Sequence, residues 1–276
     1  MNTQFSFYDE TYNPDSFDNY SLRFYLSDDF VAWCIIDLIR NKFVSFRYLT
    51  LPSQNWADKL NYLNEILATE HLEKNKFRKC QVLYNTAASI LIPASVEGTE
   101  TNRDILEFTC KGLSLRDKIH SSQITDTISN IFAVPEDLTR FFEKLGDYAI
   151  MHPYTPLIQQ LKVIAGKGTA ITTEMFSGGM LLAAMKNEDL VFCNSFRCEA
   201  PSDFAYHVAG VYKSLGFDLN EVPLHVTGIT EVKDERITQI TRFVRKVVMR
   251  SPSPELLFSY RFNEIPKHWF TLMFDM

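Results

Sequence analysis

Apolar and polar residues alternate in three short runs near the start of the chain, and a polar turn separates each run from the next. The runs span residues 22–26, 30–36 and 43–49, and the first turn is Ser27-Asp28-Asp29. Alternation broken by polar turns is typical of antiparallel β-strands. The middle run is almost wholly apolar, which favours a strand that is covered on both faces. We therefore predict a three-stranded antiparallel unit with residues 30–36 at its centre.

A second set of three apolar runs begins at residue 170, whereas the first begins at residue 22. Each set is followed by a segment with apolar residues at steps of four, three and four, which predicts a helix with one apolar stripe. These helices begin near Trp56 and Pro201, and each is followed by another apolar run. The order of three strands, a helix and a strand thus occurs twice, and this predicts two similar lobes.

The segment between the two sets supplies further elements of the first lobe. Pro135 is expected at the first helical position and Gly146 after the last, since these residues favour those positions. The predicted elements are a strand ending at Pro93, a helix over residues 102–112, a hairpin over 118–134, a helix over 135–145, a strand over 148–151 and a helix over 153–165.

Basic residues crowd the chain after Gly228, from Lys233 to Arg250. Apolar residues spaced as on a helix predict that this segment is helical, with a strand near residues 246–249. A basic helix face is more often solvated than a binding patch. The last residues, 264–276, are rich in large apolar side chains, which favours burial in the core over a docking surface. In the basic helix predicted after Lys233, the apolar positions are Ile237, Ile240, Val244 and Val247.

Composition excludes several classes of protein. The net charge of −6 over 276 residues opposes nucleic-acid binding, which needs a concentrated cationic surface. No apolar run approaches the ~20 residues of a membrane helix, so we expect no membrane insertion. Residues 1–20 are polar and acidic, unlike a signal peptide, and are interpreted as a flexible arm. The five cysteines and six histidines form no metal-binding or redox spacing, so we predict no metal site and a reducing, cytoplasmic location.

The duplicated order of elements resembles the actin-like ATPase fold and its ribonuclease-H-like relatives. The chain is also similar to a bacterial family of unknown function with that fold, through Leu91-Ile92-Pro93, residues 200–204 and Leu215-Gly216-Phe217. In layout it resembles the actin-like proteins of cell division, pilus assembly and secretion. The resemblance implies an α/β protein of two lobes around a central cleft. The lobes would span residues 21–166, with an inserted subdomain at about 93–134, and residues 167–276.

The resemblance also implies where to look for a ligand, because actin-like proteins bind ATP with magnesium between their lobes. The turn after the first strand of each lobe wraps the phosphates there, and a double glycine after the fourth strand contacts the adenosine. Here the first turn lacks glycine, the second keeps an acid and glycines, and the fourth-strand motif keeps one glycine of two. We therefore expect a degenerate nucleotide cleft. Its candidate residues are Asp28, Asp29, Glu174, Ser177, Gly178, Gly179 and Gly228.

No catalytic constellation is sharp enough to name a reaction, and we assign no catalytic residue. A nuclease of the related fold needs acids on its central strands, yet residues 21–27 contain none. Two hypotheses remain. The first is a non-hydrolysing scaffold that binds an unidentified protein by a sheet edge or by its aromatic carboxyl terminus. The second is an ATP-dependent switch or weak ATPase. Strand edges of such three-stranded units also permit a homodimer.

Overall fold

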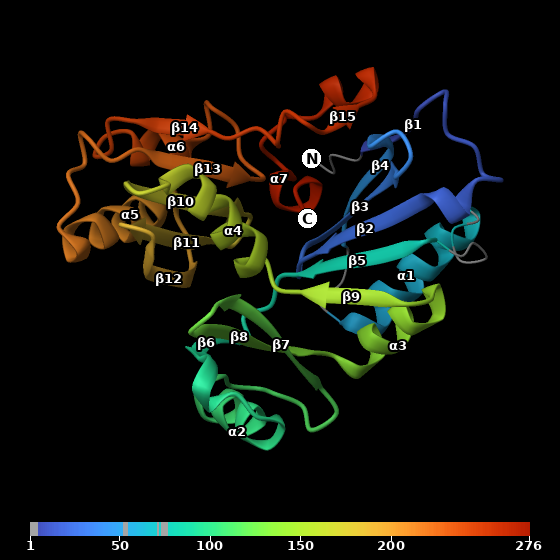
Figure 1. The fold of residues 1–276 in the computed structure, drawn as a ribbon, viewed down its shortest axis with the longest axis horizontal. Coiled ribbons are helices and arrows are strands. Elements are labelled where there is room, and N and C mark those ends of the chain that lie inside the picture. Colours follow the sequence, from blue (N-terminus) through green and yellow to red (C-terminus); the bar gives the residue numbers. More distant parts are fainter. Residues whose placement is uncertain (1–4, 52–54, 71, 73–76) are drawn as a thin grey trace. The chain divides into compact units, whose positions relative to one another are not determined.

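The computed structural model describes residues 5–51, 55–70, 72 and 77–276, and these form an α/β protein with three β-sheets (Figure 1). The chain divides into two compact units. Unit 1 comprises Met1–Pro153 and Pro254–Phe262, and unit 2 comprises Tyr154–Ser253 and Asn263–Met276. We expected the boundary near residue 166. Helix α4 (Tyr154–Ala165) instead packs on two strands of unit 2, so it belongs with that unit.

Unit 1 is built on a seven-stranded mixed sheet in which β3 has a central place. All eight residues of β3 are buried, which confirms the prediction from its apolar run. Helices α1 (Trp56–Thr69) and α3 (Glu136–Leu145) pack their apolar stripes against the sheet, and the side chains of both helices and of the sheet form one hydrophobic core. The strand order is β1-β4-β3-β2-β5-β9, with β15 also on β4. The strands are β1 (Phe5–Tyr8), β2 (Tyr20–Leu26), β3 (Phe30–Asp37), β4 (Lys42–Thr50), β5 (Lys79–Tyr84), β9 (Tyr148–Met151) and β15 (Leu257–Phe258).

The amino-terminal segment is not a flexible arm over its described length. Residues Phe5–Tyr8 form β1, which pairs antiparallel with the outer edge of β4. The Phe7 ring lies 5.8 Å from that of Phe46, between ring centroids, and the Tyr8 hydroxyl donates a hydrogen bond to Glu70. The prediction failed because a four-residue strand gains its stability from its partner and leaves a weak pattern. Residues 1–4 lie outside the described part of the chain.

An inserted subdomain follows β5 and contains a three-stranded sheet in the order β6-β8-β7. One turn of 3₁₀ helix and helix α2 connect β6 to the hairpin, and α2 packs Leu106 against Ile131 and its neighbours. The next helix, α3, begins at Glu136, so Pro135 is its N-cap residue and not the first helical residue that we expected. The elements are β6 (Ser89–Pro93), α2 (Thr99–Thr109), β7 (Lys118–Thr125) and β8 (Ile128–Val134).

Unit 2 repeats the topology of unit 1. Its sheet has the order β12-β11-β10-β13-β14, with two antiparallel pairs followed by two parallel pairs. The order β4-β3-β2-β5-β9 of unit 1 has the same sequence of directions. The predicted duplication is therefore present in the topology. The elements are β10 (Thr169–Phe176), β11 (Gly179–Lys186), β12 (Asp189–Arg197), α5 (Pro201–Leu215), β13 (Leu224–Gly228), α6 (Glu235–Ile240) and β14 (Val247–Met249).

The basic segment of unit 2 is a short helix, shorter than we expected. Helix α6 ends at Ile240, and the chain then turns, which buries Val244 in the core before β14 begins. Several basic residues therefore lie on the turn and not on a helix face. The apolar carboxyl terminus is buried, as predicted, with Phe270 and Leu272 fully covered. The remaining short elements are the 3₁₀ helices at Phe17–Asn19, Ala94–Val96 and Tyr260–Glu264, and α7 (Thr271–Phe274).

Within the residues that the structure describes, no helix combines the length and apolar character needed to cross a bilayer. The core of unit 1 also encloses a histidine. His152 follows β9, its ring lies beside Phe132, and its Nε2 is 3.2 Å from the carbonyl oxygen of Thr86. Burial lowers the pKa of His152 to about 3. The imidazole is therefore neutral at pH 7, with Nε2–H as the donor.

We predict that His152 makes the protein less stable as the pH is lowered. The unfolded chain binds a proton near pH 6.5, whereas the folded chain resists protonation until about pH 3, so stability is lost as the pH falls. The expected loss from this group is about 2 kcal/mol between pH 7 and pH 5. Urea unfolding at the two pH values measures it. His152→Gln should remove that part of the pH slope, and an unchanged slope would contradict the prediction.

Candidate functional site

The candidate nucleotide residues divide between the two units. Asp28 and Asp29 lie in unit 1, on the turn between β2 and β3. Glu174, the turn residues 177–179 and Gly228 lie in unit 2, around the ends of β10 and β13. Each group is therefore described within its own unit.

The turn of unit 1 is held by hydrogen bonds to neighbouring parts of the same unit. The Ser27 N–H donates to the carbonyl of Phe30 at 2.9 Å, which closes the turn. A lysine from α1, Lys59, donates from Nζ to the carbonyl oxygen of Asp28 at 2.7 Å. Lys59 is only 1% exposed, and its ammonium lies 4.6 Å from the centre of the Trp56 ring. A buried cation of the chain therefore fixes this turn.

The two aspartates of this turn differ in burial, since Asp28 is exposed and Asp29 is half-buried. Burial raises the pKa of Asp29, the neighbouring Asp28 charge raises it further, and the Lys59 charge opposes both effects. Burial lowers the pKa of Lys59, while the two aspartates work to raise it. The turn therefore carries negative charge, and α1 places the positive charge of Lys59 beside it. The sequence did not reveal Lys59, because it occupies a helical position that reads as ordinary solvated surface.

The turn of unit 2 is a tight β-hairpin with two residues at its tip. Phe176 pairs with Gly179, and the exposed Ser177 and Gly178 connect them. A Cβ atom on Gly179 would lie 2.2 Å from the carbonyl oxygen of Phe196, so a side chain there would collide with the neighbouring strand. Gly178 has open space around it. Only Gly179 is therefore required by the sheet itself.

Gly228 ends β13 where that strand pairs with β10. Its φ is +95°, and a Cβ atom on it would lie 2.1 Å from the carbonyl oxygen of Met175, so glycine is required here. One residue earlier, Thr227 pairs with Glu174, whose side chain is 1% exposed. The structure therefore brings Glu174, Gly228 and the start of the Ser177 turn to the same end of two adjacent parallel strands.

Arg236 connects the two loops that follow β10 and β13. Its guanidinium donates to the carbonyl of Phe176 at 3.0 Å and to that of Ile229 at 2.9 Å. It also donates to both carboxylate oxygens of Asp234, the N-cap residue of α6. Burial works to raise the pKa of Asp234, but the Arg236 hydrogen bonds and charge outweigh it and lower that pKa. From the sequence we expected Arg236 on a solvated basic helix face, and only the three-dimensional packing reveals this network.

The backbone directly after β13 is hydrogen-bonded within unit 2. The N–H groups of Gly228, Ile229 and Thr230 donate to the carbonyls of His268, Met175 and Gly228, respectively. The Thr230 carbonyl accepts from the indole N–H of Trp269 at 2.6 Å and lies 2.7 Å from the His268 Nε2. A cavity of about 270 Å³ borders this loop, Asp234 and Arg236. The amides of residues 228–230 are therefore already hydrogen-bonded within the unit.

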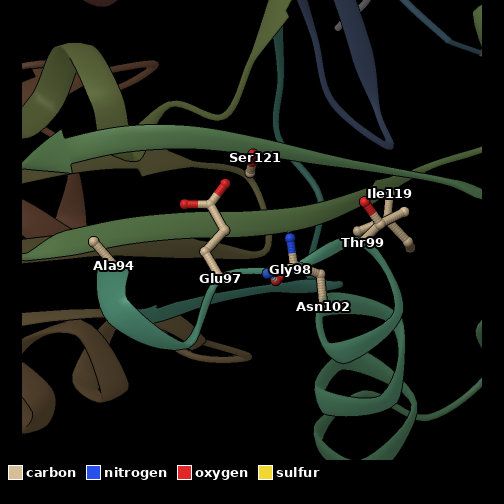
Figure 2. Close-up of a pocket in the computed structure, with 7 residues that line it drawn as sticks. All are labelled: Ala94, Glu97, Gly98, Thr99, Asn102, Ile119 and Ser121. Atoms are coloured by element: carbon tan, nitrogen blue, oxygen red, sulfur yellow. Dashed lines mark hydrogen bonds between the residues drawn. The ribbon is translucent and has the colours of Figure 1, made fainter.

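A larger cavity, of about 480 Å³, lies in the inserted subdomain at the start of α2 (Figure 2). Glu97 extends toward the strand that carries Ser121, while Asn102 belongs to the first turn of the helix. The hydroxyls of Ser121 and Ser129 lower the pKa of Glu97. One carboxylate with hydroxyl and amide neighbours can hydrogen-bond a polar group. The sequence does not reveal this cavity, because its residues come from the segment between β6 and α2, from α2 and from β7, and they form no motif.

Metal chemistry has no evident place in the described part of the chain. There, no three histidine, cysteine or acidic side chains gather closely enough to hold a metal ion. All five cysteines are free thiols.

Comparison with known proteins identifies the family of this chain. Residues 9–247 match a family described as "protein of unknown function (DUF3822)". The chain belongs to this DUF3822 family. No curated protein sequence matches the chain.

Solved structures show the fold of this DUF3822 protein. A Bacteroides thetaiotaomicron protein with actin-like ATPase fold and unknown function has a TM-score of 0.75 and 16% identity, covering 86% of this chain and 92% of that one. The PilM–PilN type IV pilus biogenesis complex matches at 0.58 and 10%, covering 92% and 96%. The ethanolamine utilization protein EutJ from Carboxydothermus hydrogenoformans matches at 0.51 and 10%, covering 93% and 88%. The expected actin-like fold is confirmed.

We predict that Arg236→Ala destabilises unit 2, because it removes charged hydrogen bonds to two loops and leaves Asp234 without its cation. The expected loss in the free energy of unfolding is about 2–4 kcal/mol. Arg242→Ala is the matched control, since Arg242 is exposed and close in sequence, and its expected effect is within ~0.5 kcal/mol. Urea denaturation measures both variants. Equal effects of the two substitutions would contradict the structural role of Arg236.

Proposed function

We propose that this protein is a non-hydrolysing scaffold that binds another protein, and that its actin-like frame has lost the chemistry of a nucleotide site. The observation that carries this proposal is the network around Arg236. It ties together the loop after β10 and the loop after β13, which the resemblance assigned to phosphate and adenosine. The Arg236 guanidinium already donates to carbonyl and carboxylate oxygens of its own chain, so these donors are not available to a phosphate.

The loop chemistry in unit 2 supports the same conclusion. The resemblance assigns the loop after β13 to the adenosine, yet the N–H groups of residues 228–230 in this loop already donate within the chain. The cavity beside Arg236, at about 270 Å³, is below the range of about 300–1,000 Å³ that small-molecule sites occupy. Glu174 is 1% exposed, which does not suit a carboxylate that holds hydrated magnesium.

The turn of unit 1 supports it as well. Glycine is absent between Ser27 and Phe30, so side chains crowd the backbone where a phosphate would approach. Asp28 and Asp29 would repel a triphosphate, and the buried cation Lys59 already donates to the Asp28 carbonyl. These residues do not fit ATP with magnesium.

Two observations favour protein binding as the remaining role. The PilM–PilN complex shows that a protein similar in fold to this one assembles with another protein. The inserted subdomain also exposes large apolar side chains, with Phe108 at 92% and Leu115 at 86%. Exposed apolar surface is typical of interaction sites when it gathers in one region. The aromatic carboxyl terminus, in contrast, is buried and does not provide a docking surface.

We predict that ATP with magnesium does not raise the melting temperature of the protein. A ligand that binds the folded state stabilises it by mass action, by about 2.7 kcal/mol at 100 times its dissociation constant. A thermal-shift titration with up to millimolar ATP and magnesium therefore detects even weak binding. Gly178→Val is the matched variant, because open space around Gly178 lets the variant fold.

A shift in the wild-type protein that Gly178→Val abolishes would overturn the proposal in favour of the alternative, an ATP-binding switch or weak ATPase. A shift of equal size in both proteins would also overturn it and would place the nucleotide away from the Ser177–Gly179 turn.

A further inference from the structure

Strand β7 is an open edge of the sheet in the inserted subdomain (Figure 1). The sheet has the order β6-β8-β7, and among the described residues no strand pairs with the outer side of β7. Residues 119–125 include no acidic residue, lysine, arginine, proline or glycine, which are the usual means of protecting an edge. An open edge can accept a strand from another chain. Strand β12 of unit 2 is a similarly open edge, so openness alone does not identify an occupant.

The hydrogen-bond pattern of the sheet shows which groups of β7 face outward. The Ala133 N–H donates to the carbonyl of Ala88, so Ala133 turns its backbone groups toward β6. Its neighbour Phe132 therefore bonds toward β7, where its partner is His120. The pairing with β8 is regular over residues 118–123 of β7, and its irregularity comes after them. The residues whose N–H and C=O groups face outward are therefore Ile119, Ser121 and Gln123.

The side chains of these three residues lie on the face of the sheet that α2 covers. Ile119 packs against the core beneath α2, and both Ile119 and Ser121 border the cavity of about 480 Å³ at the start of this helix. Side chains alternate between the two faces along a strand, and residues directly opposite each other on neighbouring strands share a face. A strand added to β7 would therefore place the side chain opposite Ser121 at this cavity, with about 5 Å between the two Cβ atoms.

The cavity contains one carboxylate, and none of the ion pairs within the described residues involves it. This residue, Glu97, is exposed and extends toward the strand that carries Ser121 (Figure 2). The hydroxyls of Ser121 and Ser129 lower the pKa of Glu97, so it is ionised at neutral pH. The other polar side chains of the cavity, Thr99 and Asn102, are uncharged. An ammonium or guanidinium group therefore complements this cavity, whereas a second carboxylate would be repelled.

We propose that β7 binds an extended segment of a partner protein as an added strand, and that a lysine or arginine of this segment enters the cavity and pairs with Glu97. The residue two positions away on the segment then lies opposite Ile119, where an apolar side chain is favoured. Main-chain hydrogen bonds to β7 supply affinity, and the cavity supplies specificity. This inference rests on the proposed function of a protein-binding scaffold and names the chemistry of the partner.

Selection from a phage-displayed library of random octapeptides tests the recognised chemistry. Wild-type protein should enrich peptides that carry lysine or arginine at one fixed position and an apolar residue two positions from it. Glu97→Gln should lose the preference for the basic residue and should bind a selected peptide about tenfold more weakly in fluorescence polarisation. Asp104→Asn is the matched control, because Asp104 is also an exposed acid of this subdomain, on α2. It should retain both the preference and the affinity.

Backbone variants test whether the peptide binds as a strand. Ser121→Pro removes an outward N–H, and proline is tolerated on an edge strand where the N–H faces solvent. It should weaken binding about tenfold more than Ser121→Ala, which also lacks the hydroxyl but keeps the N–H. Methylation of alternate backbone nitrogens of the peptide should block binding in one phase and not in the other. Circular dichroism melting confirms that each variant folds.

Four results would overturn this inference: no enriched peptide, enrichment without a basic residue, a Glu97→Gln protein that keeps the preference, or equal effects of the two Ser121 variants. Binding of n-butylamine as tight as that of the peptide would also overturn it, because the site would then be a pocket for small amines. The proposed function fails by a different measurement, the ATP titration. Enriched peptides without a basic residue would support the scaffold role while removing Glu97 from the binding site.

Discussion

Parallel pairing of the first strand of each sheet with the strand that returns from its helix is the constraint on which this structure depends. β2 pairs with β5 in unit 1, and β10 pairs with β13 in unit 2. A parallel pair needs a long crossover connection, and here that connection contains two further strands and a helix. The helix covers one face of the sheet, so the crossover and the core form together. The same pairing aligns the ends of the two strands and brings their loops into contact.

In unit 2 this alignment is close enough to decide residue identity. Gly228 has to be glycine because it lies against the backbone of Met175 in the paired strand β10 and its φ is positive. Glycines at such places in a nucleotide-binding fold are readily taken as ligand contacts. Here the sheet itself needs Gly179 and Gly228, so their presence is explained without a ligand. The side chains that fill the loops, above all Arg236, follow from the same geometry.

The two copies of the unit also show how one topology is completed in different ways. Unit 1 covers the edge of β4 with short strands from both ends of the chain, Phe5–Tyr8 and Leu257–Phe258. Unit 2 has no such strand within the described residues, and the middle of β12 is uncharged. A sheet edge satisfies its backbone groups with water, with its own chain or with another chain. The two copies therefore differ in whether a further strand completes the sheet edge.

The sequence by itself determined the elements whose signal is local and periodic. The alternation in β2–β4, the apolar run of β3 and the stripes of α1 and α5 are each readable within about ten residues. Their repetition also determined the duplicated fold, because order along the chain limits the topology. Tertiary structure decided the rest: β1 exists through its pairing with β4, α6 ends early because Val244 is drawn into the core, and α4 joins the unit whose strands it covers. Lys59 and Arg236 are likewise charged residues in amphipathic segments, and a sequence pattern assigns such residues to solvent. Only contacts between segments distant in sequence show that these two cations hold the turns in place.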